Sequence, residues 1–363
     1  MKCFFIANSE WYLSNFRAST LHEFSRIGEV VCLFPRGSGD GSLDAMPVVK
    51  SPFRLNPVSL NPVIEMFGLL SFLWVAVRDR PDLFFSFNPK TNLYSLIVAW
   101  LLRIPCIPNV SGVGVASQLT GWKGTVYRGV ASFFYRRAAH VLFQNPDDLA
   151  SFIKDGWVSP DRASLIPGSG VNLDLFFPKP SEGRKFTFLL AARLIKNKGI
   201  VEYLTAARSI ADSMPGCEFL LAGVPDRSDR AIDPRLMDKL CDHPNIHFLG
   251  HVRDMPGLLA EVDCVVLPSY YPEGIPKSLI EAASSGKVII TTDTPGCREV
   301  IDGNGLLIEP GSVASLAQAM QSILEKKENE LSAMRLASRS LAESRFDEKI
   351  VIGRYVDLAK SHC

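Results

Sequence analysis

The sequence lacks the patterns that would identify a metal-binding, disulfide-stapled or membrane-spanning protein. Its eight cysteines are scattered, with no Cys-x-x-Cys pair and no spacing typical of metal ligands, so we expect reduced, buried thiols in a cytoplasmic protein and no metal site. Two longer apolar stretches, 66–77 and 93–102, fall short of the roughly 20 residues of a spanning helix and are interpreted as core or interfacial helices. The apolar run at the N-terminus is too short for a signal peptide and is interpreted as a first strand.

The sequence has almost no excess charge, yet one long segment has no acidic residue. The net charge of +1 argues against a general nucleic-acid partner. Between residues 83 and 146 the charged residues are six cations, Lys90, Arg103, Lys123, Arg128, Arg136 and Arg137. Within 121–137 these cations alternate with aromatic residues, which predicts reversible attachment to an anionic membrane surface. The alternative is a helix with a buried aromatic face and solvated arginines. Single-stranded RNA also selects such residues, but no RNA-binding module is recognisable.

Short strand-like runs alternate with helical patterns along the whole chain. Six runs in the first half and five in the second have this character: 3–7, 30–34, 83–87, 106–109, 140–144, 163–166, 186–192, 218–222, 246–249, 264–267 and 288–291. Such alternation is typical of parallel sheets covered by helices, so the sequence predicts an α/β fold.

The predicted fold has two domains and a C-terminal helix. A polar stretch with two prolines and a glycine, 176–183, is the expected linker. The domains are therefore expected at 1–178 and 179–345. Residues 346–363 are expected to form a helix that packs back across both domains.

The most informative motif contains two glutamates. Glu273 follows the apolar strand 264–268 in a loop that contains proline and glycine, and Glu281 lies in a helix expected to start at Pro276. Both carboxylates would lie at the carboxyl edge of a parallel sheet, where open α/β folds bind ligands. There they can accept hydrogen bonds from a polyhydroxylated ligand. The alternative for Glu281 is an ordinary helix side chain.

Two cations are predicted at the same edge. Arg193 and Lys198 follow the strand 186–192 and precede the helix 200–210. Cations beside a helix N-terminus form an anion site suited to a diphosphate, although a solvated basic turn would look the same. An anion site and a hydroxyl site on one edge together predict a nucleotide-diphosphate sugar. No Gly-x-Gly-x-x-Gly follows the first strand, which disfavours a nicotinamide oxidoreductase.

These motifs resemble the retaining glycosyltransferases of family 4, which have the GT-B fold of two facing Rossmann-like domains with an interdomain cleft. The resemblance covers nearly the whole chain and rests on the order and spacing of several segments. They are the Glu-x7-Glu pair Glu273/Glu281, the pair Arg193/Lys198, and the segments 166–172, 250–252 and 295–307.

The resemblance implies a role for each of these residues. Arg193 and Lys198 would bind the donor diphosphate and stabilise its charge as it leaves, and no obligatory metal or other cofactor is expected. Glu273 would bind hydroxyls of the donor sugar, and Glu281 the ribose. Further donor contacts are expected from Gly223, Val252, Ser269, Gly274, Ile275, Pro276 and Leu279.

Within the family, segments 109–114 and 168–172 resemble enzymes that add a hexose or N-acetylhexosamine to a polyprenyl-diphosphate sugar. This implies a UDP-sugar donor, a lipid-linked acceptor, a role in surface glycan synthesis and a place on the inner face of the cytoplasmic membrane. The acceptor is expected near Asn8, Ser111, Gly112 and Arg128. The chain departs from the family at 7–11, where the usual glycine-rich turn is missing, and at Ser111, near the expected place of a histidine.

Two other functions share this donor. A sugar-nucleotide epimerase of similar two-domain build would need acid and base residues in the cleft and no lipid acceptor. An inactive scaffold would bind the sugar nucleotide without turnover. Detection of a transferred sugar separates both from a glycosyltransferase.

Overall fold

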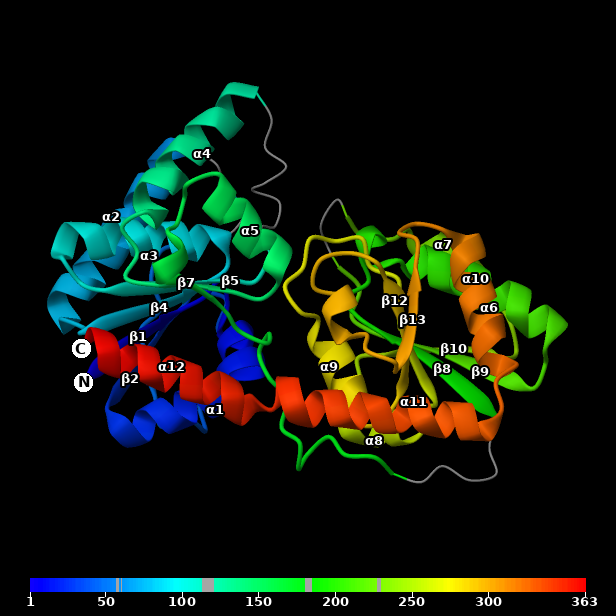
Figure 1. The fold of residues 1–363 in the computed structure, drawn as a ribbon. Helices are drawn as coiled ribbons and strands as arrows, with labels where there is room; N and C mark the ends of the chain where they lie inside the picture. The colour runs from blue at the N-terminus through cyan, green and yellow to red at the C-terminus, as the bar shows by residue number, and fades with distance from the viewer. Residues whose placement is uncertain (57–58, 60, 113–120, 180–184, 227–229) are drawn as a thin grey trace. The chain divides into compact units, whose positions relative to one another are not determined.

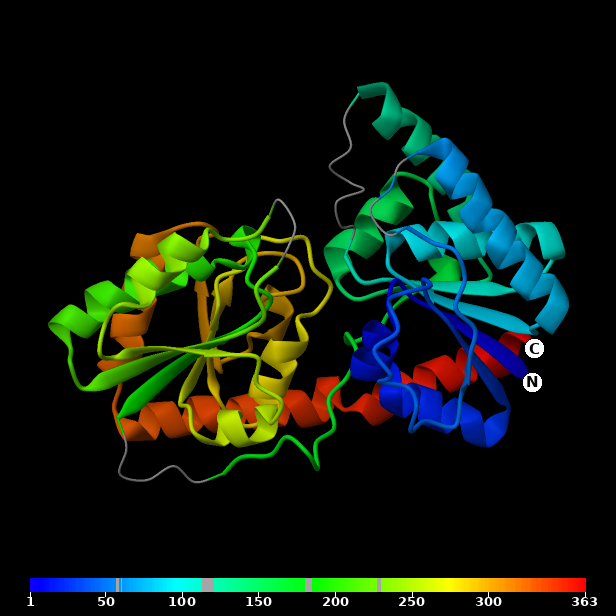
Figure 2. The same ribbon diagram turned by 180° about the vertical axis from the view of Figure 1, so that it is seen from behind.

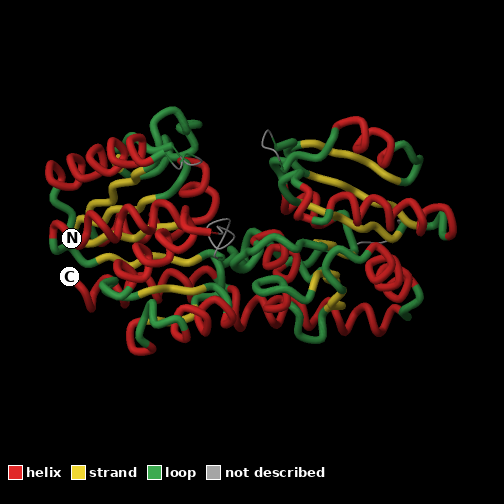
Figure 3. Tube along the Cα trace, turned by 90° about the horizontal axis from the view of Figure 1, so that it is seen from above, coloured by secondary structure: helices red, strands yellow, loops and turns green. Residues whose placement is uncertain are grey.

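The computed structural model describes residues 1–56, 59, 61–112, 121–179, 185–226 and 230–363, apart from the side chains of residues 122 and 123. The chain divides into two compact units. The first comprises residues 1–169 together with 348–363, and the second comprises residues 170–347. Each is a parallel sheet between helices, which confirms the predicted α/β fold with two Rossmann-like domains (Figures 1 and 3).

The first unit is built on a seven-stranded sheet in the order β3-β2-β1-β4-β5-β6-β7. Every neighbouring pair is parallel. The strands are β1 (Lys2–Ile6), β2 (Glu29–Leu33), β3 (Val49–Lys50), β4 (Leu83–Phe87), β5 (Cys106–Val110), β6 (Val141–Phe143) and β7 (Ala163–Leu165). All six predicted strands are present. The short edge strand β3 was not predicted, because two exposed residues leave no pattern.

Helices cover both faces of this sheet. They are α1 (Glu10–Ile27), α2 (Pro62–Asp79), α3 (Pro89–Leu102), α4 (Gly121–Tyr135), α5 (Pro146–Lys154), the 3₁₀ turn η2 (Pro160–Arg162) and α12 (Glu348–His362). Successive strand residues point to opposite faces, so Phe4 joins the core under α2 to α5 and Phe5 joins the core under α1 and α12. Because both faces are buried, the strands are continuously apolar, and this made them predictable.

The C-terminal helix α12 belongs to the first unit. Val351, Tyr355 and Ala359 are fully buried in its core, and Asn109 Nδ2 donates a hydrogen bond to Tyr355 Oη at 2.6 Å. The boundary between the units lies after Ser169, earlier than the expected position after residue 178. The reason is that 170–178 packs on the second unit, where Val171 and Phe176 join the core.

The second unit has a six-stranded parallel sheet in the order β10-β9-β8-β11-β12-β13. Its strands are β8 (Phe186–Ala191), β9 (Cys217–Ala222), β10 (Ile246–Gly250), β11 (Cys264–Leu267), β12 (Val288–Thr292) and β13 (Gly305–Ile308). Its helices are η3 (Lys196–Lys198), α6 (Ile200–Ser213), α7 (Pro234–Cys241), α8 (Met255–Ala260), α9 (Lys277–Ser284), η4 (Arg298–Val300), α10 (Val313–Leu324), α11 (Glu328–Leu341) and the π-helical turn η5 (Ala342–Phe346).

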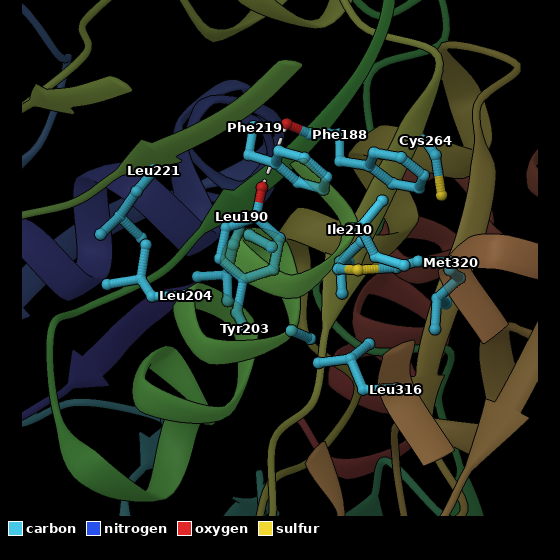
Figure 4. Packing of buried hydrophobic residues seen from close by; sticks show 14 of the residues in the cluster. Phe188, Leu190, Tyr203, Leu204, Ile210, Phe219, Leu221, Cys264, Leu316 and Met320 are labelled. Carbon is cyan, nitrogen blue, oxygen red and sulfur yellow. Dashed lines mark hydrogen bonds between the residues drawn. The ribbon is translucent and has the colours of Figure 1, made fainter. Parts of the chain in front are cut away.

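Aromatic and aliphatic side chains from β8, β9 and α6 fill one core of this unit (Figure 4). Phe188 and Phe219 stack with ring centroids 5.2 Å apart. The buried hydroxyl of Tyr203 donates to the carbonyl oxygens of Phe188 at 3.1 Å and Leu220 at 3.0 Å. Helix α6 is thereby fixed to the strand β8, whose carboxyl end leads into the candidate site.

Within the described part of the chain, no helix combines the length and the apolar character that crossing a membrane would require.

Candidate active site

The predicted donor residues lie where the strand order of the second sheet reverses. Strand β8 lies between β9 and β11, so the connections that follow β8 and β11 leave in opposite directions and open a crevice between them. The loop after β8 carries Lys198, and the loop after β11 carries Ser269 and Glu273. Tyr270 N donates to Asn197 O at 3.0 Å, which joins the two loops.

A glycine permits this close approach. Gly199 has φ +73°, and a Cβ atom there would lie 2.3 Å from the carbonyl oxygen of Pro268. A side chain at residue 199 would therefore push the two loops apart. This gives Gly199 a steric role in addition to ending the turn η3.

Lys198 and Glu273 form an ion pair at the crevice. The Nζ–Oε2 distance is 2.5 Å, and the side chains are only 11% and 12% exposed. The hydroxyl of Ser269 donates to Glu273 Oε1 at 2.6 Å. Three residues predicted from the sequence, Lys198, Ser269 and Glu273, therefore lie together. Each carboxylate oxygen of Glu273 accepts a hydrogen bond from one of the other two. A buried, hydrogen-bonded pair of this kind is a fixed arrangement of charge.

Arg193, the other predicted cation, has a different environment. It follows β8 in the same loop but its side chain is exposed. An exposed guanidinium at this place is open to an anionic ligand.

Glu281 lies on the second turn of α9 and is buried. Burial raises the pKa of its carboxyl group to about 6, opposed by Lys277, whose Nζ lies 3.7 Å away. Pro276 is the N-cap of α9, one residue outside the expected helix start. Pro276 itself contributes no side-chain cap, and the positive end of the helix dipole is directed to the same loop as Glu273.

A third loop supports the site. Its segment 295–307 is part of the family resemblance, but no individual role was predicted for Thr292, Thr294 or Gly296. Gly296 has φ +83°, and a Cβ atom there would lie 1.5 Å from the carbonyl oxygen of Gly274. Thr292 Oγ1 donates to Ser269 O, and Thr294 Oγ1 approaches the same oxygen at 3.4 Å. The sequence signal was present, since a Thr-rich strand end followed by Pro-Gly is typical of a tight turn.

The remaining predicted donor residues differ in how much surface they offer. Gly223 N donates to Gly250 O at 2.8 Å, and Val252 packs at the edge of a core cluster. Ile275 and Leu279 are buried in that cluster. The side chain of Leu279 is fully buried and its N–H donates to Pro276 O at 3.1 Å, so this residue supports the loop from within the core.

The predicted acceptor residues lie in the first unit, where the sheet order also reverses, between β1 and β4. Asn8 follows β1, and its N–H donates to Asn88 Oδ1 at 3.2 Å. Asn88 has φ 73° and ψ 144°, a backbone conformation that is rare outside glycine and is typical of functional sites. Sequence reasoning missed Asn88, because backbone strain leaves no pattern.

The other acceptor residues are more dispersed. Ser111 and Gly112 follow β5, and Gly112 has φ +92°. The adjoining residues 113–120, which include part of the motif 109–114, lie outside the described residues. Arg128 is exposed on α4, where its Nη2 lies 3.4 Å from Thr125 Oγ1.

Comparison with known proteins places each half of the chain with sugar-transferring enzymes. Residues 25–168 match the family model of the glycosyl transferase 4-like domain, and residues 185–326 match that of glycosyl transferases group 1.

Curated relatives and solved structures agree with these matches. One relative is the N,N'-diacetylbacillosaminyl-diphospho-undecaprenol alpha-1,3-N-acetylgalactosaminyltransferase of Campylobacter jejuni, 25% identical over 99% of this chain and 98% of the relative. Another is the UDP-Gal:alpha-D-GlcNAc-diphosphoundecaprenol alpha-1,3-galactosyltransferase of Escherichia coli, 25% identical over 74% of this chain and 73% of the relative. The fold is similar to that of Anabaena Alr3699/HepE in complex with UDP and glucose, with a TM-score of 0.82 at 18% identity over 99% of this chain and 100% of that one.

Proposed function

Because this chain belongs to the GT-B glycosyltransferases of family 4, we propose that it moves a hexose or N-acetylhexosamine from a UDP-sugar to a lipid-linked saccharide. The acceptor would be a polyprenyl-diphosphate sugar, as in the names of the two bacterial relatives. The observation that carries the proposal is the cluster of Lys198, Ser269 and Glu273 at the switch point of the second sheet. It presents a cation and hydroxyl-binding oxygens within a few ångströms of each other.

Each residue would act on one part of the donor. Lys198 and Arg193 would bind the diphosphate, and the N-terminus of α9 would add its partial positive charge. Glu273 would accept hydrogen bonds from sugar hydroxyls, and Glu281 from the ribose. When the donor binds, the ammonium of Lys198 would be shared between Glu273 and the phosphate, so its position is set before the substrate arrives.

We propose transfer with retention of configuration. The bond from the anomeric carbon to the diphosphate oxygen breaks, and the acceptor hydroxyl forms a new bond on the same face. The hydroxyl proton passes to an oxygen of the leaving diphosphate. The protein cations stabilise the charge that develops there, so the reaction would need no obligatory metal, and transfer should persist in a metal chelator.

A donor panel would test the proposal. Radiolabelled UDP-hexoses and UDP-N-acetylhexosamines are supplied with a bacterial membrane lipid extract, and a lipid-linked product is measured. Lys198→Ala and Glu273→Ala should each abolish most of the product, whereas near-normal transfer by both variants would end the assignment. An isomerised nucleotide sugar without acceptor would indicate an epimerase. Donor binding without any product in a broad acceptor screen would indicate a scaffold.

The location follows from the acceptor. A polyprenyl chain resides in the bilayer, so the enzyme would work at the inner face of the cytoplasmic membrane, attached peripherally, in surface glycan synthesis. The cations and aromatic residues of 121–137 support attachment by the first unit. No nucleic-acid partner is proposed.

A further inference from the structure

Helix α2 is apolar on the side that faces the core and also on the opposite side. Its buried residues are Gly68, Phe72, Val75 and Ala76. Its outward residues include six large apolar side chains that are each between 51% and 61% exposed: Val63, Met66, Phe67, Leu70, Trp74 and Val77. At 100° per residue these six lie within an arc of about 100°. A helix that is apolar all round is normally buried, so this stripe is unusual on a protein surface.

The neighbouring helices extend the stripe into a patch. Helix α3 packs against both α2 and α4, and all three lie on the same side of the sheet (Figures 1 and 2). Trp100 and Leu101 on α3 and Val126, Val130 and Phe133 on α4 are also exposed. No other helix of the described residues has more than two exposed large apolar side chains. The exposed rings of Trp100 and Phe133 meet edge to face with centroids 6.1 Å apart, and exposed apolar side chains gathered on neighbouring helices mark an interaction site.

The charge around the patch is positive. The two acidic residues of α2 are each held by a cation: Glu65 by Lys90 at 2.9 Å and Asp79 by Arg78 at 2.5 Å. Arg103 ends α3 beside Trp100 and Leu101. Arg137 lies over the ring of Phe133, 3.6 Å from its centroid, and lines a shallow hollow with Arg136. An apolar centre with arginines at its border complements acyl chains beneath a layer of phosphates.

We propose that the outward face of α2, α3 and α4 inserts into one leaflet of an anionic membrane, with α2 lying in the plane of the interface. Helix α2 is about 27 Å long and would be immersed about 5–10 Å. Trp74 points outward between Phe67 and Leu70 on the stripe, so its ring would be immersed together with theirs. Phe67 and Leu70 enter the hydrocarbon, and the arginines bind lipid phosphates. The purpose of this contact rests on the proposed lipid-linked acceptor, but its structural basis does not.

Vesicle flotation of the full chain, without donor or acceptor, tests the proposal. Vesicles of phosphatidylcholine alone are compared with vesicles in which one third of the lipid is phosphatidylglycerol. The protein should float with both and bind the anionic vesicles more tightly. The triple variant Phe67→Ser, Leu70→Ser, Trp74→Ser should reduce binding to both by roughly a hundredfold or more, because each side chain loses its transfer into hydrocarbon.

The charge contribution is tested separately. Arg103→Gln with Arg137→Gln should reduce binding to the anionic vesicles by roughly tenfold to thirtyfold and leave binding to phosphatidylcholine unchanged. Leu336→Ser is the matched control, since Leu336 is 70% exposed on α11 in the second unit. It should float like the unaltered protein. Thermal unfolding of the triple variant should be unchanged, because its three positions face away from the core.

Tryptophan quenching by brominated lipid locates the contact. Trp74→Phe should remove a large part of the quenching, whereas Trp11→Phe should not, because Trp11 is similarly exposed but lies on α1, on the other face of the sheet. Equal quenching in both variants would overturn the proposal.

Other results have distinct meanings. A dimer that the triple variant converts to a monomer, with no vesicle binding by either protein, would show that the patch binds a second copy and would overturn the inference. Transfer to the lipid acceptor without vesicle binding would also overturn the inference, but it would leave the proposed function intact. Vesicle binding through α2 with no transfer to any acceptor would leave the inference standing and end the proposed function.

Discussion

Lys198 and Glu273 are separated by 75 residues in the sequence, yet the lysine Nζ lies 2.5 Å from a carboxylate oxygen of the glutamate in an almost fully buried pair. Neither side chain can be removed alone without leaving the other charge poorly solvated. The pair therefore links the stability of the second unit to its proposed chemistry, and the two effects can be separated by mutation.

Lys198→Ala should reduce kcat by about 10²–10³, because it removes a preorganised cation from the departing diphosphate. It should also destabilise the fold by about 1–3 kcal/mol, since Glu273 loses a charged partner. Adding Glu273→Ala should restore part of the stability and none of the activity. Urea unfolding and steady-state transfer by the single and double variants measure both quantities. Recovery of activity in the double variant would contradict the assignment.

Glu281 makes stability depend on pH. Burial raises the pKa of its carboxyl group from 4.5 to about 6, so the folded protein favours the protonated form. The stabilisation is complete below pH 4.5 and is lost as the pH rises through 6. Glu281→Gln should therefore raise the free energy of unfolding by about 2 kcal/mol above pH 7 relative to the unaltered protein, and the gain should vanish near pH 4.

Unfolding measured across this range tests the sign of the effect. Glu261→Gln, at an exposed position, serves as a control that should change stability little at either pH. A Glu281→Gln gain that is the same at pH 4 and above pH 7 would show that burial does not govern this carboxyl group.

Alanine substitutions at Gly296 and Gly303 distinguish the cost of steric overlap from the cost of backbone strain. Both have positive φ, +83° and +71°, but a Cβ atom at Gly296 would meet Gly274 O at 1.5 Å, whereas one at Gly303 would meet no atom within 4 Å. Gly303→Ala should cost only the conformational penalty of about 1–2 kcal/mol and retain transfer. Gly296→Ala should cost more and should weaken donor binding, because the loop of Glu273 must move. Comparable unfolding midpoints and donor affinities in the two variants would show that the loops adjust.

Sequence alone predicted much of the framework. Strands such as β1 and β11 are buried on both faces, so continuous apolar runs locate them. The position of Lys198, Glu273 and Glu281 after predicted strands selected these residues, and the resemblance to family 4 added their roles. The pairing of Lys198 with Glu273 was not predictable, because it depends on how closely Gly199 approaches Pro268.

Two further features of the structure could not be predicted from the sequence alone. The strained backbone of Asn88 has no sequence pattern. The apolar stretch 66–77 is helical, as predicted, but periodicity cannot decide between a core helix and an interfacial helix when apolar residues occupy both sides. Only the structure shows which of its residues are exposed.

Tyr355 tests how α12 supports the first unit. Its buried hydroxyl accepts a hydrogen bond from Asn109 Nδ2 at 2.6 Å, and Asn109 also accepts one from Gln144 Nε2 at 3.1 Å. Tyr355→Phe keeps the ring packing but leaves the Asn109 amide without this acceptor, so stability should fall by about 1–3 kcal/mol. Because Asn109 lies two residues before Ser111, we also expect a higher KM for the acceptor with little change in the KM for the donor. Urea unfolding and transfer kinetics with each substrate varied in turn provide the measurement. A loss of donor affinity instead would contradict the assignment of the acceptor to the first unit.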